Sequence, residues 1–175
     1  AKKLVRVSLS DLAASGAKPL GYLLSLSIPA DTEENWVAEF AGGLCEDQKE
    51  FGISLFGGDT TSTRGPLSLS LTAVGEATTE RVVRRSGAEP GQSVFVTGTV
   101  GDSALGLTLI KKLGRREAHL RSPELVQKYL VPNPRVNLAA ILGNYATASI
   151  DISDGLVGDL GHICKASGVS ISIDY

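Results

Sequence analysis

Three aspartates are concentrated near the C-terminal end of the sequence, in the stretch TASIDISDGLVGDLGH. Asp151, Asp154 and Asp159 lie there at an apparent junction between a strand and a helix. Carboxylates this close together repel one another unless a cation neutralises their charge. Mg²⁺ binds a few carboxylate oxygens and leaves coordination positions open for substrate phosphates. The stretch therefore predicts a magnesium site that handles phosphates.

Two motifs earlier in the chain add further carboxylates and phosphate-binding groups. Asp11 lies in SDLAASGA, and Asp59 lies in FGGDTT. Gly57 and Gly58 allow a ligand to approach the backbone closely, and the threonines that follow Asp59 supply hydroxyl groups. We therefore expect one acidic site that is built from segments far apart in the sequence.

Each aspartate also has a purely structural interpretation. Asp11, Asp102 and Asp154 each precede a helical pattern, where an aspartate commonly caps the first turn. Residues 57–59 have the composition of a hairpin turn between two strands. Capping does not explain Asp151, because a charged side chain inside an apolar strand is costly unless it is paired or bound to a metal. Asp151 thus favours the functional interpretation of its cluster.

Other polar residues and motifs narrow the chemistry. Arg85 is suited to pairing with phosphate oxygens, although arginines in a polar connector are often only solvated. His119 and His162 are isolated, and we assign them no role. The sequence has no P-loop, no protein-kinase signature, no G-x-S-x-G elbow and no H-E-x-x-H or paired C-x-x-C. Phosphate chemistry here would depend on magnesium held by carboxylates.

The composition is that of a globular protein. The chain has 175 residues, of which 42% are hydrophobic, which is enough for one domain or two small ones. A formal net charge of −2 gives no broad basic surface for nucleic acid, and no apolar run is long enough for a membrane span. Arg6 and Asp11 interrupt the only segment that resembles a signal peptide. Cys45 and Cys164 have no metal-ligand spacing, and two cysteines in a chain of this size do not make a disulfide framework, so we expect a reducing cytoplasm.

Local patterns predict alternating strands and helices in the first part of the chain. We expect the following elements: a strand at 4–9, a short helix at 10–17, a strand at 21–28, a helix from the Asp31/Glu34 capping box to Gly52, and strands at 53–56 and 67–73. Helix-period apolar residues such as Phe40 and Leu44 predict that the long helix packs on a sheet.

A polar stretch at 78–91 is the best candidate for a connector between a unit at 1–77 and a second unit at 92–175. In the second unit we expect the following elements: a strand at 93–97, a helix from Asp102 to Gly114, helices opening at Ser122-Pro123 and Asn133-Pro134, a strand at 148–152, a helix with a buried stripe of Leu156, Leu160 and Ile163 that ends at Gly168, and a strand at 169–173. The predicted fold class is mixed α/β with two domains.

Five motifs in this order and spacing carry a family resemblance: SDLAASGA, FGGDTT, ERVVRRSGAEPGQ, TGTVGDSALGL and IDISDGLVGDLGHI. Together they resemble the thiamine-monophosphate kinase family, within the aminoimidazole-ribonucleotide-synthetase-like superfamily. The resemblance implies transfer of the γ-phosphoryl group of ATP to thiamine monophosphate, with several Mg²⁺ ions. It also implies two α/β domains, with the nucleotide between them, and a homodimer formed through the N-terminal domains.

The resemblance assigns roles to residues at the matching motif positions. The implied magnesium ligands are Asp11, Asp59, Asp151 and Asp154. The implied ATP contacts are Gly58, Asp59, Arg85 and Ser153. Asp59 and Asp154 are the expected catalytic residues. The resemblance gives no role to Asp159.

The sequence departs from the family pattern at both ends and at one helical position. Family members have an upstream Gly-Asp-Asp segment and continue beyond the position of Tyr175 with thiamine-recognition residues, so we expect this chain to be a fragment that is inactive alone. Ser15 occupies a position where the family usually has Met, a small change without an expected consequence.

Two alternatives remain open. One is another synthetase of the superfamily, such as selenophosphate synthetase, which would have a catalytic Cys or selenocysteine in the N-terminal region that is missing here, or the purine-pathway synthetase. The other is a non-catalytic module that binds nucleotide or metal. Production of ADP separates an enzyme from a binding module.

Overall fold

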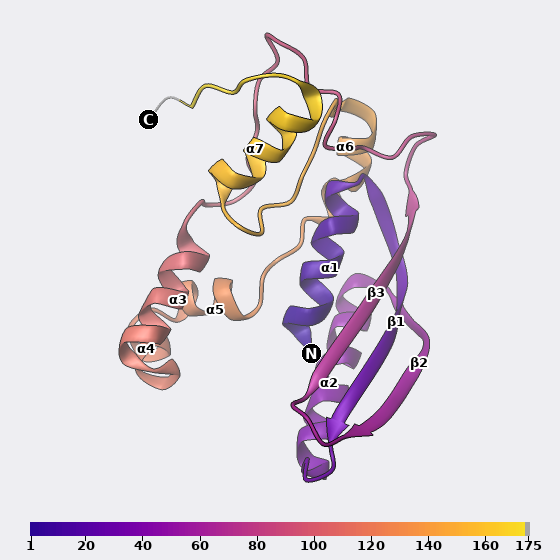
Figure 1. Ribbon diagram of the computed structural model, residues 1–175, viewed down its shortest axis with the longest axis vertical. Coiled ribbons are helices and arrows are strands. Elements are labelled where there is room, and N and C mark those ends of the chain that lie inside the picture. Colours follow the sequence, from indigo (N-terminus) through magenta and orange to yellow (C-terminus); the bar gives the residue numbers. More distant parts are fainter. Residues whose placement is uncertain (174–175) are drawn as a thin grey trace.

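The computed structural model describes residues 1–173 (Figure 1). Its first half contains α1 (Lys2–Ala14), β1 (Ala17–Pro29), α2 (Glu34–Phe51), β2 (Ser54–Thr63) and β3 (Ser68–Ala77). Its second half contains α3 (Asp102–Leu113), α4 (Arg115–Arg121), α5 (Pro123–Leu130), a 3₁₀ turn (Val136–Leu138), α6 (Ala139–Tyr145) and α7 (Leu156–Ser167). The predicted mixed α/β fold is confirmed. The final two residues of the predicted 92–175 unit lie outside the described part.

The strands form a three-stranded sheet in the order β2-β1-β3. β1 pairs in parallel with β2 and antiparallel with β3, and α2 makes the crossover that a parallel pair requires. Gly57, Gly58 and Asp59 lie inside β2, and β1 separates β2 from β3, so the hairpin interpretation is wrong. A Cβ on Gly58 would lie 1.8 Å from the carbonyl oxygen of Leu24, so the strands can approach here only because the residue is glycine.

One face of the sheet is covered by helices, and the other is open. The core between the helices and the sheet consists of Val5, Leu9, Tyr22, Leu24, Phe40, Leu44 and Ile53. On β3, alternate residues such as Ser70 and Thr72 are exposed, and they lie beside exposed Ser25 and Leu23 of β1. The predicted packing of α2 against the sheet is confirmed, because Phe40 and Leu44 lie in this core.

The first element differs from the prediction, since residues 2–14 form one helix rather than a strand and a short helix. The segment fits both periods: Val5, Val7 and Leu9 alternate, while Val5, Leu9 and Ala13 recur every fourth residue. Packing decides for the helix, which buries Val5, Leu9 and Ala13 and leaves Val7 43% exposed. Asp11 consequently lies near the end of α1, and its interpretation as an N-cap is wrong.

Two other predicted caps are also wrong. α2 begins after Glu33, not Asp31, and has no side-chain cap hydrogen bond. Gly101 precedes α3, so Asp102 is its first residue, and the Asp102 carboxylate pairs with Lys128 and Thr99. The Asp31 side chain is therefore exposed to solvent and that of Asp102 binds other side chains, and neither caps the helix that it was predicted to cap.

The second half contains fewer strands than its apolar runs predict. Residues 93–97, 148–152 and 169–173 have no strand assignment in the described structure. A strand needs a neighbouring strand that completes its hydrogen bonds. In the described structure, the segment at 148–152 makes a single backbone hydrogen bond to a neighbouring segment, from the Ser149 amide to the Arg84 carbonyl oxygen (3.0 Å).

The helices of the second half follow the predictions more closely. α3 ends at Gly114, α5 begins with Ser122 before Pro123, and α7 ends at Gly168 with a left-handed φ of 69°. The helix expected at Asn133-Pro134 is instead a 3₁₀ turn at Val136–Leu138 that leads into α6.

Candidate functional site

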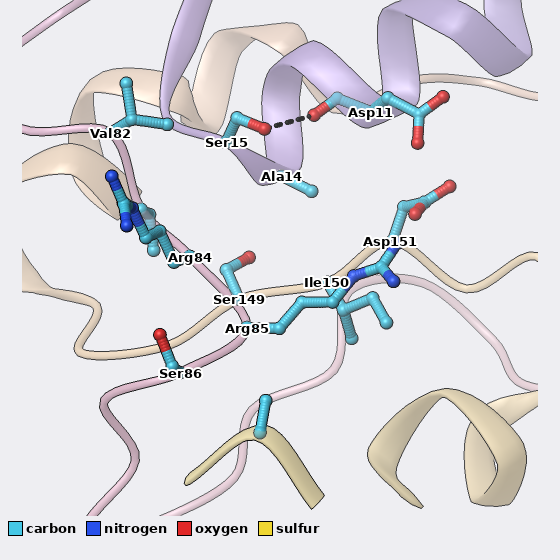
Figure 2. A pocket seen from close by; sticks show the side chains of 12 residues that line it. Asp11, Ala14, Ser15, Val82, Arg84, Arg85, Ser86, Ser149, Ile150 and Asp151 are labelled. Carbon is cyan, nitrogen blue, oxygen red and sulfur yellow. Dashed lines mark hydrogen bonds between the residues drawn. The ribbon is translucent and has the colours of Figure 1, made fainter. Parts of the chain in front are cut away.

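A cavity of about 410 Å³ lies beside the C-terminal end of α1 (Figure 2). Three segments far apart in the sequence form most of its lining, which also includes Ala166 of α7. These segments are the end of α1 with Asp11 and Ser15, the connector at 82–86, and residues 149–151.

Backbone hydrogen bonds hold the connector against the end of α1. Gly16 has a left-handed φ of 71° that turns the chain out of the helix. Its carbonyl oxygen accepts from the amide of Thr78 (3.1 Å), and that of Ser15 accepts from the amide of Val83 (3.0 Å). Residues 78 and 83 are therefore held against the two residues that directly follow α1.

The connector is also attached to α7 through one serine. The Ser167 hydroxyl oxygen accepts from the amides of Gly87 (3.2 Å) and Ala88 (3.1 Å), and the hydroxyl donates to the carbonyl oxygen of Arg85 (3.2 Å). The segment that the sequence predicts to be a polar connector therefore forms part of the cavity lining, to which it contributes Arg85.

Asp11 and Asp151 face one another across the cavity (Figure 2). Burial raises the pKa of the Asp151 carboxyl above its usual value, and the negative charge of Asp11 raises it further. The Arg85 guanidinium, which extends toward Asp151 in Figure 2, acts in the opposite direction on this pKa. The cavity lining therefore combines two mutually repelling carboxylates with two arginines, Arg84 and Arg85, of which Arg85 extends toward Asp151.

The position of Asp11 within its helix supports a role in this cavity. A carboxylate in the last turn of a helix faces the negative end of the helix dipole, which disfavours it. Such a charge gains from a cation placed beyond the helix end, and Asp151 would gain from the same cation. Two facing carboxylates fit a hard divalent ion that leaves coordination positions for phosphate oxygens. Within residues 1–173, no group of three or more His, Cys, Asp or Glu side chains is arranged to hold a metal.

The other sequence-predicted residues lie outside this cavity lining. Asp59 is exposed on β2, where its Oδ1 accepts from the Thr60 amide (2.9 Å), and Gly58 precedes it in the strand. Ser153 and Asp154 are exposed in the loop before α7. The structure thus brings together Asp11, Asp151 and Arg85, and it does not bring the other four residues into the same lining.

Asp159 is a residue whose role the sequence did not reveal. Its side chain is buried at 2% exposure, and its Oδ2 accepts from the backbone N–H groups of Ser153, Asp154 and Gly155. The capping interpretation of Asp154 is wrong, because Gly155 is the N-cap of α7 and no side chain caps it there. The sequence signal for such a contact is a carboxylate that lies one turn into a helix, where the helix itself follows a loop that contains glycine.

Comparison with known proteins identifies the family of the chain. The family models for the N-terminal and C-terminal domains of AIR synthase related protein match residues 1–77 and 89–175, respectively. The chain belongs to the AIR synthase related family. The fold that the sequence predicted for this superfamily is confirmed.

Relatives with high identity are thiamine-monophosphate kinases. Those of Salmonella typhimurium and Caulobacter vibrioides are each 42% identical over 174 residues, which is 99% of this chain and 53% and 48% of the respective relatives. A solved structure described as AaThiL complexed with AMPPCP and TMP is 38% identical, with a TM-score of 0.88, and the match covers 95% of this chain and 52% of that one. The predicted resemblance to this family is confirmed.

The chain spans about half the length of the relatives that it matches. No helix in the described part of the chain combines the length and the apolar character that a membrane crossing requires.

Proposed function

We propose that the protein catalyses ATP-dependent phosphorylation of thiamine monophosphate to thiamine diphosphate, and that this chain supplies part of the active site. The observation that carries the proposal is that Asp11 and Asp151 face one cavity beside Arg85, in a chain that is 42% identical to thiamine-monophosphate kinases. A structural relative whose description names both AMPPCP, an ATP analogue, and TMP supports the same pair of substrates.

The chemistry of the cavity suits transfer of a phosphoryl group to a phosphate. The acceptor oxygen is already anionic, so the barrier arises mainly from charge repulsion and alignment rather than from removal of a proton. Arg85 would donate to phosphate oxygens and hold them in place. Asp11 and Asp151 would hold Mg²⁺, which when bound offsets the negative charge of the phosphates. The lining residues include no histidine among those described, in keeping with a reaction that needs little general-base catalysis.

We propose further roles for the residues that lie outside the cavity lining. Asp59 and Asp154 would be additional magnesium ligands and the catalytic residues, and Gly58 and Ser153 would contact ATP. Asp59 lies on the open face of the sheet, where Leu23 is 47% exposed and Phe56 of the edge strand is 55% exposed. We propose that a second copy of the protein covers this face to form a homodimer, because large exposed apolar side chains and an unpaired strand edge favour association.

The proposal includes the organisation and the location of the protein. Residues 1–77 and 92–175 would belong to two domains, joined by the connector at 78–91. Cys45 and Cys164 are both free thiols, which supports a reducing, cytoplasmic location.

The test is an assay of the full-length protein with ATP, Mg²⁺ and thiamine monophosphate, in which ADP and thiamine diphosphate are both measured. The wild type should form the two products in equal amounts. Asp151→Asn and Asp154→Asn should each lower turnover by more than the roughly 10–100-fold that loss of an outer-shell partner of a metal typically costs. Asp102→Asn is the matched control, because Asp102 pairs with Lys128 on α5 outside the cavity.

Each alternative makes a distinct prediction in this assay. ADP formation only with a different acceptor would indicate another synthetase of the superfamily. Binding of AMPPCP and Mg²⁺ by a protein that forms no ADP from ATP would indicate a non-catalytic module. Wild-type turnover in folded Asp151→Asn and Asp154→Asn variants would contradict the roles proposed for these carboxylates.

A further inference from the structure

We infer that Asp159 is a positioning residue whose buried carboxylate fixes the backbone of the loop at 153–155. The inference rests on the proposed function, in which Ser153 and Asp154 of this loop contact ATP and Mg²⁺. Asp159 would not touch either ligand. It would act by holding the backbone from which these two side chains extend.

The contacts of Asp159 are concentrated on three consecutive amides. Its Oδ2 lies 2.9 Å from the amide nitrogen of Ser153, 3.2 Å from that of Asp154 and 3.1 Å from that of Gly155. The whole side chain is 2% exposed. Because these hydrogen bonds are made to a charged acceptor, they are stronger than bonds between neutral groups.

The loop depends on this carboxylate because its own side chains are exposed. Ile152, Ser153, Asp154 and Gly155 are all exposed, so little side-chain packing restrains them. Gly155 has a φ of 125°, which lets the chain turn sharply into α7. The three amides point inward to Asp159, and this arrangement leaves the Ser153 and Asp154 side chains free on the outside to meet a ligand.

A purely structural role in packing would not require a charge at this position. An apolar side chain would fill this buried position without the cost of burying a carboxylate. An acidic side chain in a capping box reaches back to the amide of the N-cap residue alone, whereas Asp159 also binds the amides of Ser153 and Asp154, which precede the N-cap Gly155. Fixing the loop accounts for both the charge and its location.

The experiment compares three variants of the full-length protein: Asp159→Ala, Asp159→Asn and Ile163→Ala. Ile163 is buried on the same helix, and none of the described hydrogen bonds joins it to the loop amides. Its variant therefore controls for a general weakening of α7. The readouts are hydrogen exchange of peptides that span residues 150–160, the affinity for AMPPCP with MgCl₂, and the kcat and KM for thiamine monophosphate.

We expect Asp159→Ala to speed amide exchange in the loop and to weaken binding of AMPPCP with MgCl₂ by about 10–100-fold, the usual effect of losing an outer-shell partner. Asp159→Asn keeps one acceptor oxygen without the charge, and it should restore part of both losses. Ile163→Ala should lower the melting temperature while leaving the nucleotide affinity and the exchange of the loop amides at wild-type values.

Failure of this inference can be distinguished from failure of the proposed function. If the wild type forms thiamine diphosphate, and Asp159→Ala equals Ile163→Ala in nucleotide affinity, kcat and loop exchange, then the positioning role is wrong and the proposed function stands. If the wild type forms no thiamine diphosphate, the proposed function fails. Loop exchange and the affinity for AMPPCP with MgCl₂ then still decide the role of Asp159, since neither readout depends on turnover.

Discussion

The ion pair between α1 and α2 leads to a quantitative prediction about stability. Arg6 is 7% exposed and Asp47 is completely buried. The Arg6 Nε donates to both carboxylate oxygens of Asp47, at 3.1 and 3.0 Å, and Nη2 donates to Oδ1 at 2.7 Å. Nη1 also donates to the carbonyl oxygen of Pro132 (3.4 Å). The pair thus secures the helix that carries Asp11 to both halves of the chain.

The perturbation is Asp47→Asn, which keeps the size of the side chain and removes its charge. Removal of one partner from a buried ion pair costs about 3–5 kcal/mol, because the remaining charge stays buried without compensation. Glu50 lies 2.5 Å from Arg6 Nη2 with its side chain 49% exposed, so it retains part of the pairing. We therefore expect a cost of about 3 kcal/mol, the low end of the range.

Urea unfolding of the chain followed by Trp36 fluorescence measures this cost. Trp36 is the single tryptophan, and it stacks on Phe40 of the core with ring centroids 5.2 Å apart. With a denaturant slope of about 2 kcal/mol per M, the midpoint should fall by about 1.5 M. The control Glu50→Gln changes a half-exposed partner of the same arginine, and its midpoint should fall by less than about 0.5 M. An Asp47→Asn midpoint within that same limit, with an unchanged slope, would refute the reasoning.

Two further predictions concern the site and the sheet. Asp151→Asn should raise the melting temperature of the metal-free protein at neutral pH. In the folded protein the pKa of Asp151 is raised above its ordinary value of 3.8, so ionisation of this carboxyl lowers the free energy of unfolding as the pH rises through the raised pKa. Asparagine carries no charge and avoids this loss. Thermal unfolding in EDTA at several pH values checks this, and a difference from wild type that does not grow with pH would contradict it. Gly58→Ala should destabilise the protein by about 1–3 kcal/mol, because the new Cβ would lie 1.8 Å from the Leu24 carbonyl oxygen. Gly57→Ala has a similar φ but meets its nearest atom at 4.0 Å, so chemical denaturation should show a smaller loss, and equal losses would exclude the steric explanation.

Regular structure was predictable from sequence wherever a local signal determines it. α2 and α7 show the expected apolar faces, and both end at glycines with left-handed φ values, Gly52 and Gly168. Helix ends of this kind depend on the conformational freedom of a single glycine, and the position of a glycine is read directly from the sequence. The motifs also predicted the family, because their residue types, order and spacing together are specific.

The sequence by itself predicted an acidic site and suggested phosphate chemistry for it, and it determined the positions of most helices. Only the tertiary structure decided that residues 2–14 form one helix, because their apolar pattern fits two periods and burial chooses between them. It also decided that Asp11 and Asp151 share a cavity and that Asp159 binds three loop amides. Contacts between distant segments depend on how helices and connector pack together, and packing is a property of the whole chain that no local pattern contains.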